Sequence, residues 1–579
     1  MISLYASGAM RRLRSRFETL YGEDAAMCLV RMAMLVGRYG INFTYKKVPS
    51  LWDQRDSVLI TYGDSIRRAG EHPLATLKTF ADDHLQGAVR TIHILPFFPY
   101  SSDDGFSVIH YRTVNPDLGT WDDVQALHAN FDLMFDLVLN HVSRHSGWFR
   151  DYELGIAPGR DYFIDVNPAE DLSAVVRPRS LPLLTKIHTR VGEKHVWTTF
   201  SADQIDLDFS NPDVLFEILD ILLLYVLMGA RIIRLDAIAY LWKKIGTSCI
   251  HLDETHQVVK IFRDFLRMVA PHVILLTETN VPHEENISYF GKGDEAHMVY
   301  QFSMPPLVLH AALSGKAKYL TRWAAALQDD APNGCTYFNF TASHDGVGVR
   351  PLEGLVPDEE LEWLVGEVKK RGGAVSTRRM SDGSDKPYEL NITYYDAVSF
   401  PSGGSEDLHA ARFLATQAVP IAFKGIPGIY INSIVATPND HALVEKTKRA
   451  RSINRTKWDY EELEKRLQDP STPNAKVLEA YLRMLRIRGK HKAFHPDGSQ
   501  RVLELDDRVF AIERLSPKKK HRIVAATNFS GDTVTIPAGV LKDAGVEIGE
   551  EINLFTEKRA SENGDLTLSP YETCWVLYG

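Results

Sequence analysis

The stretch Ile232-Ile233-Arg234-Leu235-Asp236-Ala237 decides the fold of this chain, because it places an arginine and an aspartate at the end of an apolar run. The segment before it, 216–230, has the apolar spacing of a long helix that ends at Gly229. A helix followed by a buried strand is one unit of a parallel α/β barrel, in which the carboxyl ends of the strands carry the chemistry. Asp236 is therefore a candidate functional residue, and the alternative at this point is a structural ion pair between Arg234 and Asp236.

Seven further apolar runs of strand length alternate with helical patterns along the chain. They cover residues 58–62, 91–96, 133–139, 273–278, 298–302, 336–340 and 428–431. Helices are predicted between some of them at 74–85, 121–130 and 407–418. Apolar strands separated by helices indicate parallel β/α units. With the Asp236 strand they predict a closed (β/α)8 TIM barrel, an α/β fold.

The remaining segments define the domain organisation. Two helical patterns, 10–21 and 23–39, predict an N-terminal helical extension over residues 1–52. The barrel is expected at 53–145 and 207–490, with an inserted subdomain at 146–206 and a loop insertion at about 346–393. Alternating strand patterns predict a C-terminal all-β domain at 491–579, which helix 476–488 joins to the barrel.

The composition limits the classes of function. The chain has 579 residues, is 44% hydrophobic and 24% charged, and has a net charge of −9, which argues against a nucleic-acid partner. Its four cysteines are too widely spaced to suggest a disulfide framework or a zinc site. No stretch has the pattern of a signal peptide or a membrane span, so we expect a cytoplasmic protein with no membrane partner.

Three acidic residues are predicted at the same rim of the barrel, because Asp236, Glu278 and Asp345 each follow an apolar strand run. Cleavage of a glycoside with retention needs one carboxylate that attacks the anomeric carbon and one carboxyl that protonates the leaving oxygen. A neighbouring Arg234 would lower the pKa of the attacking group, and apolar surroundings would raise that of the acid. Each carboxylate alone has an ordinary explanation as an ion pair or helix cap, but three at one rim favour a catalytic site.

Four motifs carry a resemblance to a known family. They are Asp136…Asn140-His141, Arg234-Leu235-Asp236-Ala237, Thr277-Glu278-Thr279-Asn280 and Ser343-His344-Asp345-Gly346. In order and interval they resemble the four conserved blocks of the α-amylase superfamily, glycoside hydrolase family 13. The resemblance implies that Asp236 is the nucleophile, Glu278 the acid/base and Asp345 the stabiliser of the positive sugar ring. It also implies that His141 and His344 bind hydroxyls of the donor glucose.

Further motifs resemble sucrose phosphorylase and its relatives over nearly the whole chain after residue 55. They lie at 60–62, 93–99, 104–106, 246–249 and 451–455. This resemblance implies that Asp103 and Arg451 form an ion pair that closes the donor pocket behind one glucosyl unit. It implies that Phe106 and Phe200 pack against the sugar and the reaction centre, and that Tyr240 lines the site.

Two stretches resemble the mobile loops that shape the acceptor subsite, where phosphate also binds. They are Arg177-Pro178-Arg179 and Lys386-Pro387-Tyr388-Glu389. Sucrose phosphorylases have Tyr-Gln in place of Tyr388-Glu389, so acceptor recognition should differ here. The N-terminal extension and four other stretches resemble the glucosylglycerate phosphorylase branch, whose acceptor product is glycerate; the stretches are 101–107, 197–200, 294–302 and 342–346. Arg177, Arg179 and Lys243 are candidates to pair with the glycerate carboxylate.

The carboxylates favour retaining cleavage of an α-glucoside, and the resemblance implies a glycoside phosphorylase that gives α-glucose 1-phosphate and D-glycerate, with 2-O-α-glucosylglycerate the first candidate substrate. Inorganic phosphate would be a co-substrate, and no metal or organic cofactor is expected. Residue spacing does not distinguish phosphate from water as the second nucleophile, so a hydrolase or transglucosylase stays open. Sucrose, sucrose 6′-phosphate and glucosylglycerol stay open as substrates. A non-catalytic carbohydrate-binding barrel is disfavoured, because all three carboxylates are present. A homodimer is compatible with the sequence, which does not determine the oligomeric state.

Overall fold

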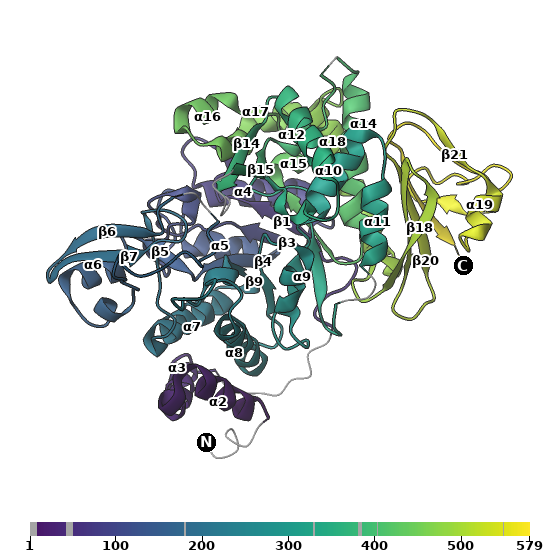
Figure 1. The fold of residues 1–579 in the computed structure, drawn as a ribbon. Coiled ribbons are helices and arrows are strands. Elements are labelled where there is room, and N and C mark those ends of the chain that lie inside the picture. Colours follow the sequence, from purple (N-terminus) through teal and green to yellow (C-terminus); the bar gives the residue numbers. More distant parts are fainter. Residues whose placement is uncertain are drawn as a thin grey trace.

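Eight parallel strands form a closed barrel at the centre of the molecule (Figure 1). The computed structural model describes residues 8–41, 50–178, 181–327, 331–379, 385–401, 403–547 and 549–578. The strand order is β1-β16-β12-β11-β10-β9-β4-β3. Their bounds are β1 Val58–Thr61, β3 Thr91–Ile94, β4 Asp132–Val138, β9 Ala230–Asp236, β10 Ile274–Thr277, β11 Met298–Tyr300, β12 Thr336–Asn339 and β16 Ile426–Tyr430. The predicted TIM barrel is confirmed.

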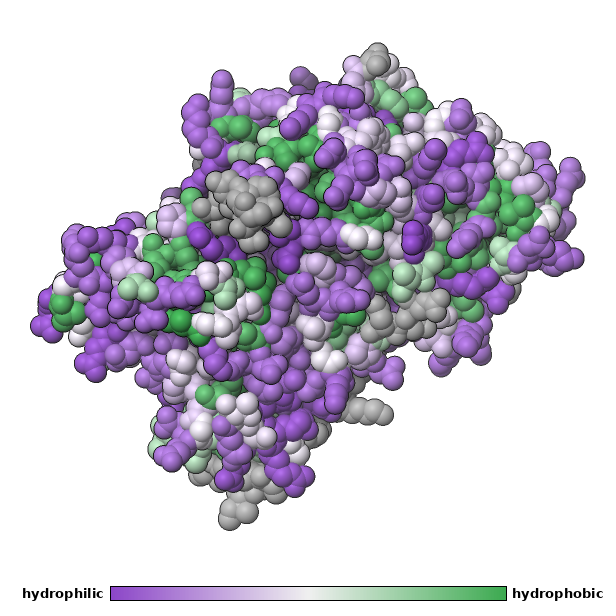
Figure 2. Space-filling model, in the orientation of Figure 1, coloured by the Kyte–Doolittle hydropathy of each residue, from purple (hydrophilic) through white to green (hydrophobic). Residues whose placement is uncertain are grey.

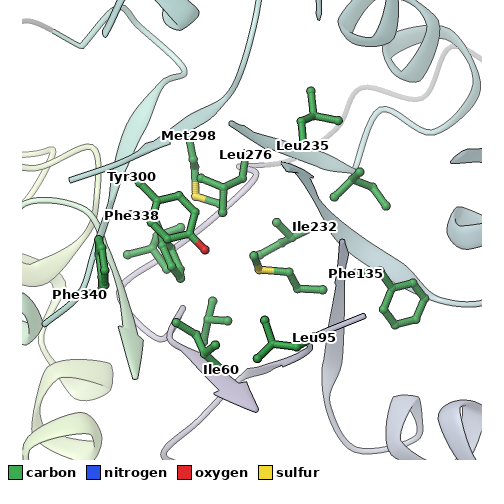
Figure 3. Packing of buried hydrophobic residues seen from close by; sticks show 14 of the residues in the cluster. Ile60, Leu95, Phe135, Ile232, Leu235, Leu276, Met298, Tyr300, Phe338 and Phe340 are labelled. Atoms are coloured by element: carbon green, nitrogen blue, oxygen red, sulfur yellow. The ribbon is translucent and has the colours of Figure 1, made fainter. Parts of the chain in front are cut away.

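The barrel interior is filled by aliphatic and aromatic side chains. Ile60, Ile232, Leu276 and Phe338 belong to four different strands, are buried, and point toward one another together with Leu95 (Figure 3). A parallel strand that is covered by helices on its outer side and by this core on its inner side is buried on both faces. That is why the strands were recognisable in the sequence as nearly continuous apolar runs.

Helices surround the barrel and return the chain to the next strand. The principal ones are α4 Pro73–Phe80, α5 Trp121–His128, α7 Pro212–Leu227, α8 Asp253–Val269, α10 Met304–Ser314, α14 Glu406–Ala422 and α18 Pro473–Lys490. Helix α7 is capped at its amino end by Asn211, whose side chain accepts a hydrogen bond from the backbone N–H of Asp213. It is followed by Gly229 at φ +102°, where a Cβ would lie 2.9 Å from the His128 ring. This glycine lets β9 begin close behind α7.

The two insertions are more regular than the sequence suggested. The first contains α6 Gly147–Leu154, the hairpin β6 Leu184–Thr189 with β7 Gly192–Trp197, and β8 Gln204–Asp206, which pairs with β5 His141–Ser143 just before the insertion. The second contains α12 Asp358–Lys370 and the sheet β13-β15-β14, with bounds β13 Val347–Gly348, β15 Asp385–Asn391 and β14 Ala374–Arg379. Tyr388 and Glu389, which were expected on a mobile loop, lie on β15.

The two ends of the chain pack on different sides of the barrel (Figure 1). Helix α2 (Gly8–Tyr21), followed by α3 (Ala25–Arg38), lies against α8, where Arg12 and Arg16 both bind Asp264. The C-terminal antiparallel sheet has the order β18-β19-β20-β24-β22 and adjoins α11 (Lys318–Ala326). Its strands are β18 Ser499–Asp506, β19 Val509–Leu515, β20 Arg522–Asn528, β24 Thr573–Tyr578 and β22 Ile552–Asn553. The N-terminal helical extension and the C-terminal all-β domain are thus confirmed as parts of the fold, and the exact boundaries stay predictions.

The surface in Figure 2 is mostly hydrophilic, with hydrophobic residues gathered in several smaller areas. Among the described helices, none is both long enough and apolar enough to cross a lipid bilayer.

Candidate active site

Strand β9 presents Arg234 and Asp236 to the same side, because residues two apart on a strand share a face. One guanidinium nitrogen of Arg234, NH1, donates to Asp136 on β4 and to Oδ1 of Asp236 at 2.7 Å. The other, NH2, lies 3.9 Å from Oε2 of Glu278, which directly follows β10. The ion pair that the sequence left open as a structural alternative is therefore present, but it is one contact in a cluster of three carboxylates.

The Arg234 side chain is held firmly in this position. Oδ2 of Asp136 lies 2.6 Å from Nε2 of His93, so a second strand fixes the aspartate that anchors the arginine. The guanidinium also lies 5.6 Å from the ring centres of Phe106 and Tyr300. Arg234 can therefore orient Asp236 and Glu278 without moving itself.

Burial controls the protonation of the catalytic pair. It raises the pKa of Asp236 to about 7 against the opposing charge of Arg234, and it raises the pKa of Glu278 to about 7 as well. Arg234 does lower the pKa of Asp236, as expected, but desolvation outweighs the ion pair, so the pKa lies above its ordinary value. Two carboxyls that repel each other hold one proton between them near neutral pH. The shorter contact of Arg234 favours the negative charge on Asp236, which leaves the proton on Glu278.

Asp345 lies in the loop after β12, beside two arginines and a histidine. Its Oδ1 is 2.5 Å from NH1 of Arg451 and 3.8 Å from NH2 of Arg455, and its Oδ2 is 3.6 Å from Nε2 of His344. Burial alone would raise the pKa of Asp345, but Arg451, His344 and Arg455 together hold it well below its ordinary value. Asp345 is therefore an ionised carboxylate beside two carboxyls that share a proton.

Aromatic rings and two histidines form the walls of the site. Phe106 stacks on the His344 ring at 4.8 Å, and His141 lies 5.2 Å from Phe200. Phe200 in turn meets the edge of Tyr240 at 5.5 Å. Burial lowers the pKa of His344 to about 3 and lowers that of His141, so both rings are neutral near pH 7. Neutral imidazoles can both donate and accept hydrogen bonds, which suits contacts to sugar hydroxyls.

One cavity brings most of the predicted site residues together. Its lining includes Asp103, Phe106, His141, Phe200, Arg234, Asp236, Glu278, His344, Asp345, Tyr388, Glu389 and Arg451. Tyr240 reaches this set through its contact with Phe200. The cavity also contains residues that the sequence reasoning missed, namely Gln204, Asn280, Phe302 and Phe340. Asn280 belongs to the motif Thr277-Glu278-Thr279-Asn280. Gln204 had no signal in the sequence: it reaches the cavity because β8 pairs with β5, which places its amide 3.1 Å from His141.

The ion pairs behind the cavity connect different residues from those emphasised in the sequence. Arg451 binds Asp345 and Glu389, while the neighbouring Arg455 binds Asp104. Asp103 is 3.5 Å from Nε2 of Gln204. The expected pairing of Asp103 with Arg451 stays a prediction. The salt bridge between Asp104 and Arg455 joins the same two segments. Asp104 is the residue after Asp103, and Arg455 lies four residues after Arg451.

The candidates for binding the acceptor carboxylate have different outcomes. The role expected for Lys243 is wrong, because its ammonium is buried, lies 2.6 Å from Asp206 and donates to Asn140 at 2.7 Å. Arg177 is exposed and donates to the carbonyl oxygen of Leu181, so its proposed role stays a prediction. Arg179 lies outside the described residues. The carboxylate of Glu389 accepts hydrogen bonds from Arg451 and from the backbone N–H of Gly346.

Within the described part of the chain, no three His, Cys, Asp or Glu side chains are placed to hold a metal ion. The groups that line this cavity include a protonated carboxyl beside an ionised one, a third carboxylate that is ionised, and neutral imidazoles. The expected independence from metals and organic cofactors stays a prediction.

A parallel barrel with these carboxylates at its carboxyl rim defines a class of glycoside-processing enzymes, and the sequence comparison agrees. Residues 84–349 match the family model of the α-amylase catalytic domain. The chain belongs to the α-amylase family.

The particular relatives are more informative than the family. The glucosylglycerate phosphorylase of Spirochaeta thermophila is 49% identical over 536 residues, covering 90% of each chain. The glucosylglycerate phosphorylase of Escherichia coli K12 is 43% identical over 532 residues, covering 91% of this chain and 92% of its own. The crystal structure of sucrose 6F-phosphate phosphorylase from Thermoanaerobacter thermosaccharolyticum superposes with a TM-score of 0.71 at 28% identity, covering 82% of this chain and 94% of its own.

Proposed function

We propose that this chain is a glucosylglycerate phosphorylase, which cleaves 2-O-α-glucosylglycerate with inorganic phosphate to α-glucose 1-phosphate and D-glycerate. The observation that carries the proposal is the similarity to glucosylglycerate phosphorylases over 90% of both chains, at 49% identity. The cavity supports it with two carboxyls that share one arginine and one proton. The buried, unpaired cysteines suit a reducing compartment, which supports a cytoplasmic location.

The first step forms a covalent intermediate. A carboxylate oxygen of Asp236 attacks the anomeric carbon, and the bond between that carbon and the glycerate oxygen breaks. Glu278 donates its proton to the departing oxygen, so neutral hydroxyl rather than alkoxide leaves. Asp345 stabilises the positive charge on the sugar ring, while His141 and His344 hold its hydroxyls. Glu278, which Ala237 N–H contacts at 3.0 Å, is left as a carboxylate.

The second step uses phosphate in the space that glycerate has left. A phosphate oxygen attacks the anomeric carbon, the ester bond to Asp236 breaks, and Glu278 takes up the phosphate proton. Two inversions at the same carbon give α-glucose 1-phosphate with retained configuration. Each group then returns to its starting protonation state, so no further reactant is needed.

The proposal is tested by running the reaction in the synthetic direction. Purified enzyme is given α-glucose 1-phosphate and one acceptor at a time: D-glycerate, glycerol, fructose or fructose 6-phosphate. We expect phosphate release to be fastest with D-glycerate. A preference for a different acceptor would contradict the substrate assignment. Release of free glucose from glucosylglycerate at the same rate without phosphate would contradict the phosphorylase assignment and favour a hydrolase.

A further inference from the structure

Glu389 is a buried carboxylate whose contacts all lead toward the catalytic centre. Only 1% of its surface is exposed. It accepts hydrogen bonds from Nε of Arg451 at 2.8 Å and from NH2 of Arg451 at 2.7 Å, which is a two-point contact with one edge of the guanidinium. It also accepts a bond from the backbone N–H of Gly346 at 2.6 Å. Each carboxylate oxygen therefore already has a partner within the protein.

The remaining edge of the same guanidinium points at a catalytic group. NH1 of Arg451 lies 2.5 Å from Oδ1 of Asp345. A guanidinium is planar and rigid, so fixing its Nε and NH2 atoms also fixes the direction in which NH1 points. The position of Glu389 is thereby transmitted to the carboxylate of Asp345.

The backbone around Asp345 is built to allow this contact. Strand β13 pairs with β15, with Gly348 opposite Glu389. A Cβ on Gly346 would lie 2.6 Å from Cγ of Glu389, and a Cβ on Gly348 would lie 2.7 Å from Nδ2 of Asn280. These two glycines let the chain pass between β15 and the catalytic rim at a distance that a side chain would prevent. From the other side, Asn454 donates to the carbonyl oxygen of Asp345 at 3.0 Å.

We propose that Glu389 is a positioning residue, which holds Arg451 by one edge and so sets the place of Asp345 in the transition state. This role differs from direct recognition of the acceptor, in which Glu389 would bind the substrate itself rather than hold Arg451. It also explains the carboxylate: glutamine offers one acceptor oxygen and would turn an N–H group toward Arg451, so it cannot make the two-point contact. The inference rests on the proposed function for its reaction, but its effect falls on formation of the glucosyl–enzyme bond.

The test uses the variant Glu389→Gln with α-glucosyl fluoride as donor. In a single turnover, fluoride release reports the first step and requires neither glycerate nor phosphate, because one equivalent leaves as the glucosyl–enzyme ester forms. We expect the rate of fluoride release to fall by about 10- to 100-fold, as for a displaced transition-state contact. The KM for glycerate in the synthetic reaction should change much less. Unchanged fluoride release together with a raised KM for glycerate would overturn the proposal and make Glu389 an acceptor contact.

A double variant tests the connection through Arg451. If Glu389 acts only by holding Arg451, adding Glu389→Gln to Arg451→Lys should cause little further loss of fluoride release. Fully additive losses would overturn the proposal. Should Glu389→Gln fold poorly, Glu389→Asp keeps the charge but shortens its reach, and the same comparison applies with that variant.

The matched control is Glu513→Gln on β19 in the C-terminal domain. Glu513 is also buried and lies 3.0 Å from an arginine, Arg501, but it is remote from the cavity in the fold. We expect Glu513→Gln to lower Tm and leave fluoride release unchanged. An equal loss in both variants would show a general stability effect and overturn the positioning role. Wild-type enzyme that releases fluoride but lacks phosphorolysis would refute only the proposed function.

Discussion

Each end of strand β9 carries an arginine, but the charged groups around the two arginines differ. At the amino end, NH1 of Arg231 lies 3.0 Å from Asp56 and 2.8 Å from Asp132. Arg90 binds the same two carboxylates, at 3.3 and 3.1 Å. Arg90 also lies 3.6 Å from Asp53, which in turn binds Arg55. Three cations and three anions therefore balance at this end, and their contacts join β9 to β4 and to the segment before β1. Such a cluster stabilises the floor of the barrel and leaves no charge without a partner.

At the carboxyl end, one arginine meets three acidic groups. Arg234 contacts Asp136, Asp236 and Glu278, and the site is too buried for water to screen their repulsion. The surplus of negative charge is relieved by a proton, which is the proton that the reaction transfers. The comparison teaches that an arginine–aspartate pair near a strand end is structural when the charges balance and chemically useful when carboxylates are in excess.

The largest effect is expected when the attacking carboxylate is removed. Asp236→Asn should lower kcat about 10⁴-fold or more, since an amide cannot form the glucosyl ester. Asp132→Asn, at the balanced end, is the matched control and should lower Tm while keeping most of the activity. Steady-state phosphorolysis and thermal unfolding of both variants decide the matter. Comparable activity losses in the two variants would break the comparison.

The second prediction concerns the proton. Glu278→Gln cannot protonate the leaving glycerate, so phosphorolysis of glucosylglycerate should fall by about 10²- to 10⁴-fold. With α-glucosyl fluoride the leaving group needs no such help, and the first step should be largely preserved. The measurement compares the loss of activity of Glu278→Gln on glucosylglycerate with its loss on α-glucosyl fluoride. An equal loss with both donors would argue against Glu278 as the general acid.

The arginines themselves give a smaller effect. Arg234→Lys should lower kcat/KM about 100-fold, because an ammonium cannot bind the three carboxylates at the angles of the guanidinium fork. Arg231→Lys replaces the corresponding residue of the balanced cluster and should reduce Tm by a few degrees with little change in kcat/KM. The comparison fails if both substitutions act mainly on stability.

The smallest effect is on the pH dependence of stability. Folding raises the pKa of Asp236 from 3.8 and that of Glu278 from 4.5, both to about 7, so the folded pair keeps a proton that the unfolded chain has lost. The stabilising contribution is complete below about pH 4 and is lost as the pH rises through about 7. Asp236→Asn should therefore gain Tm relative to the wild type at pH 8 and differ little at pH 4. Calorimetry of both proteins at pH 4 and pH 8 measures this difference in Tm. A gain in Tm at pH 4 that disappears at pH 8 would contradict the prediction.

The barrel was predictable from local pattern because its strands are buried on both faces and read as apolar runs. Asp236, Glu278 and Asp345 followed from the same pattern, since each comes after such a run. The small sheets of the insertions were not predictable in this way, because β6, β7, β14 and β15 are partly exposed and have mixed composition. Lys243 was misjudged for a similar reason: its partner Asp206 lies on β8, far from it in sequence.

The sequence by itself determined which side chains reach the carboxyl rim, because strand periodicity and chain order fix the end at which a residue emerges. Only the tertiary structure decided how those side chains pair. Whether Arg451 binds Asp345, whether Glu389 faces an acceptor or an arginine, and whether Arg234 or burial controls the pKa of Asp236 all depend on contacts between distant segments. Such contacts set distance and desolvation, and electrostatic energy in a buried site depends on both.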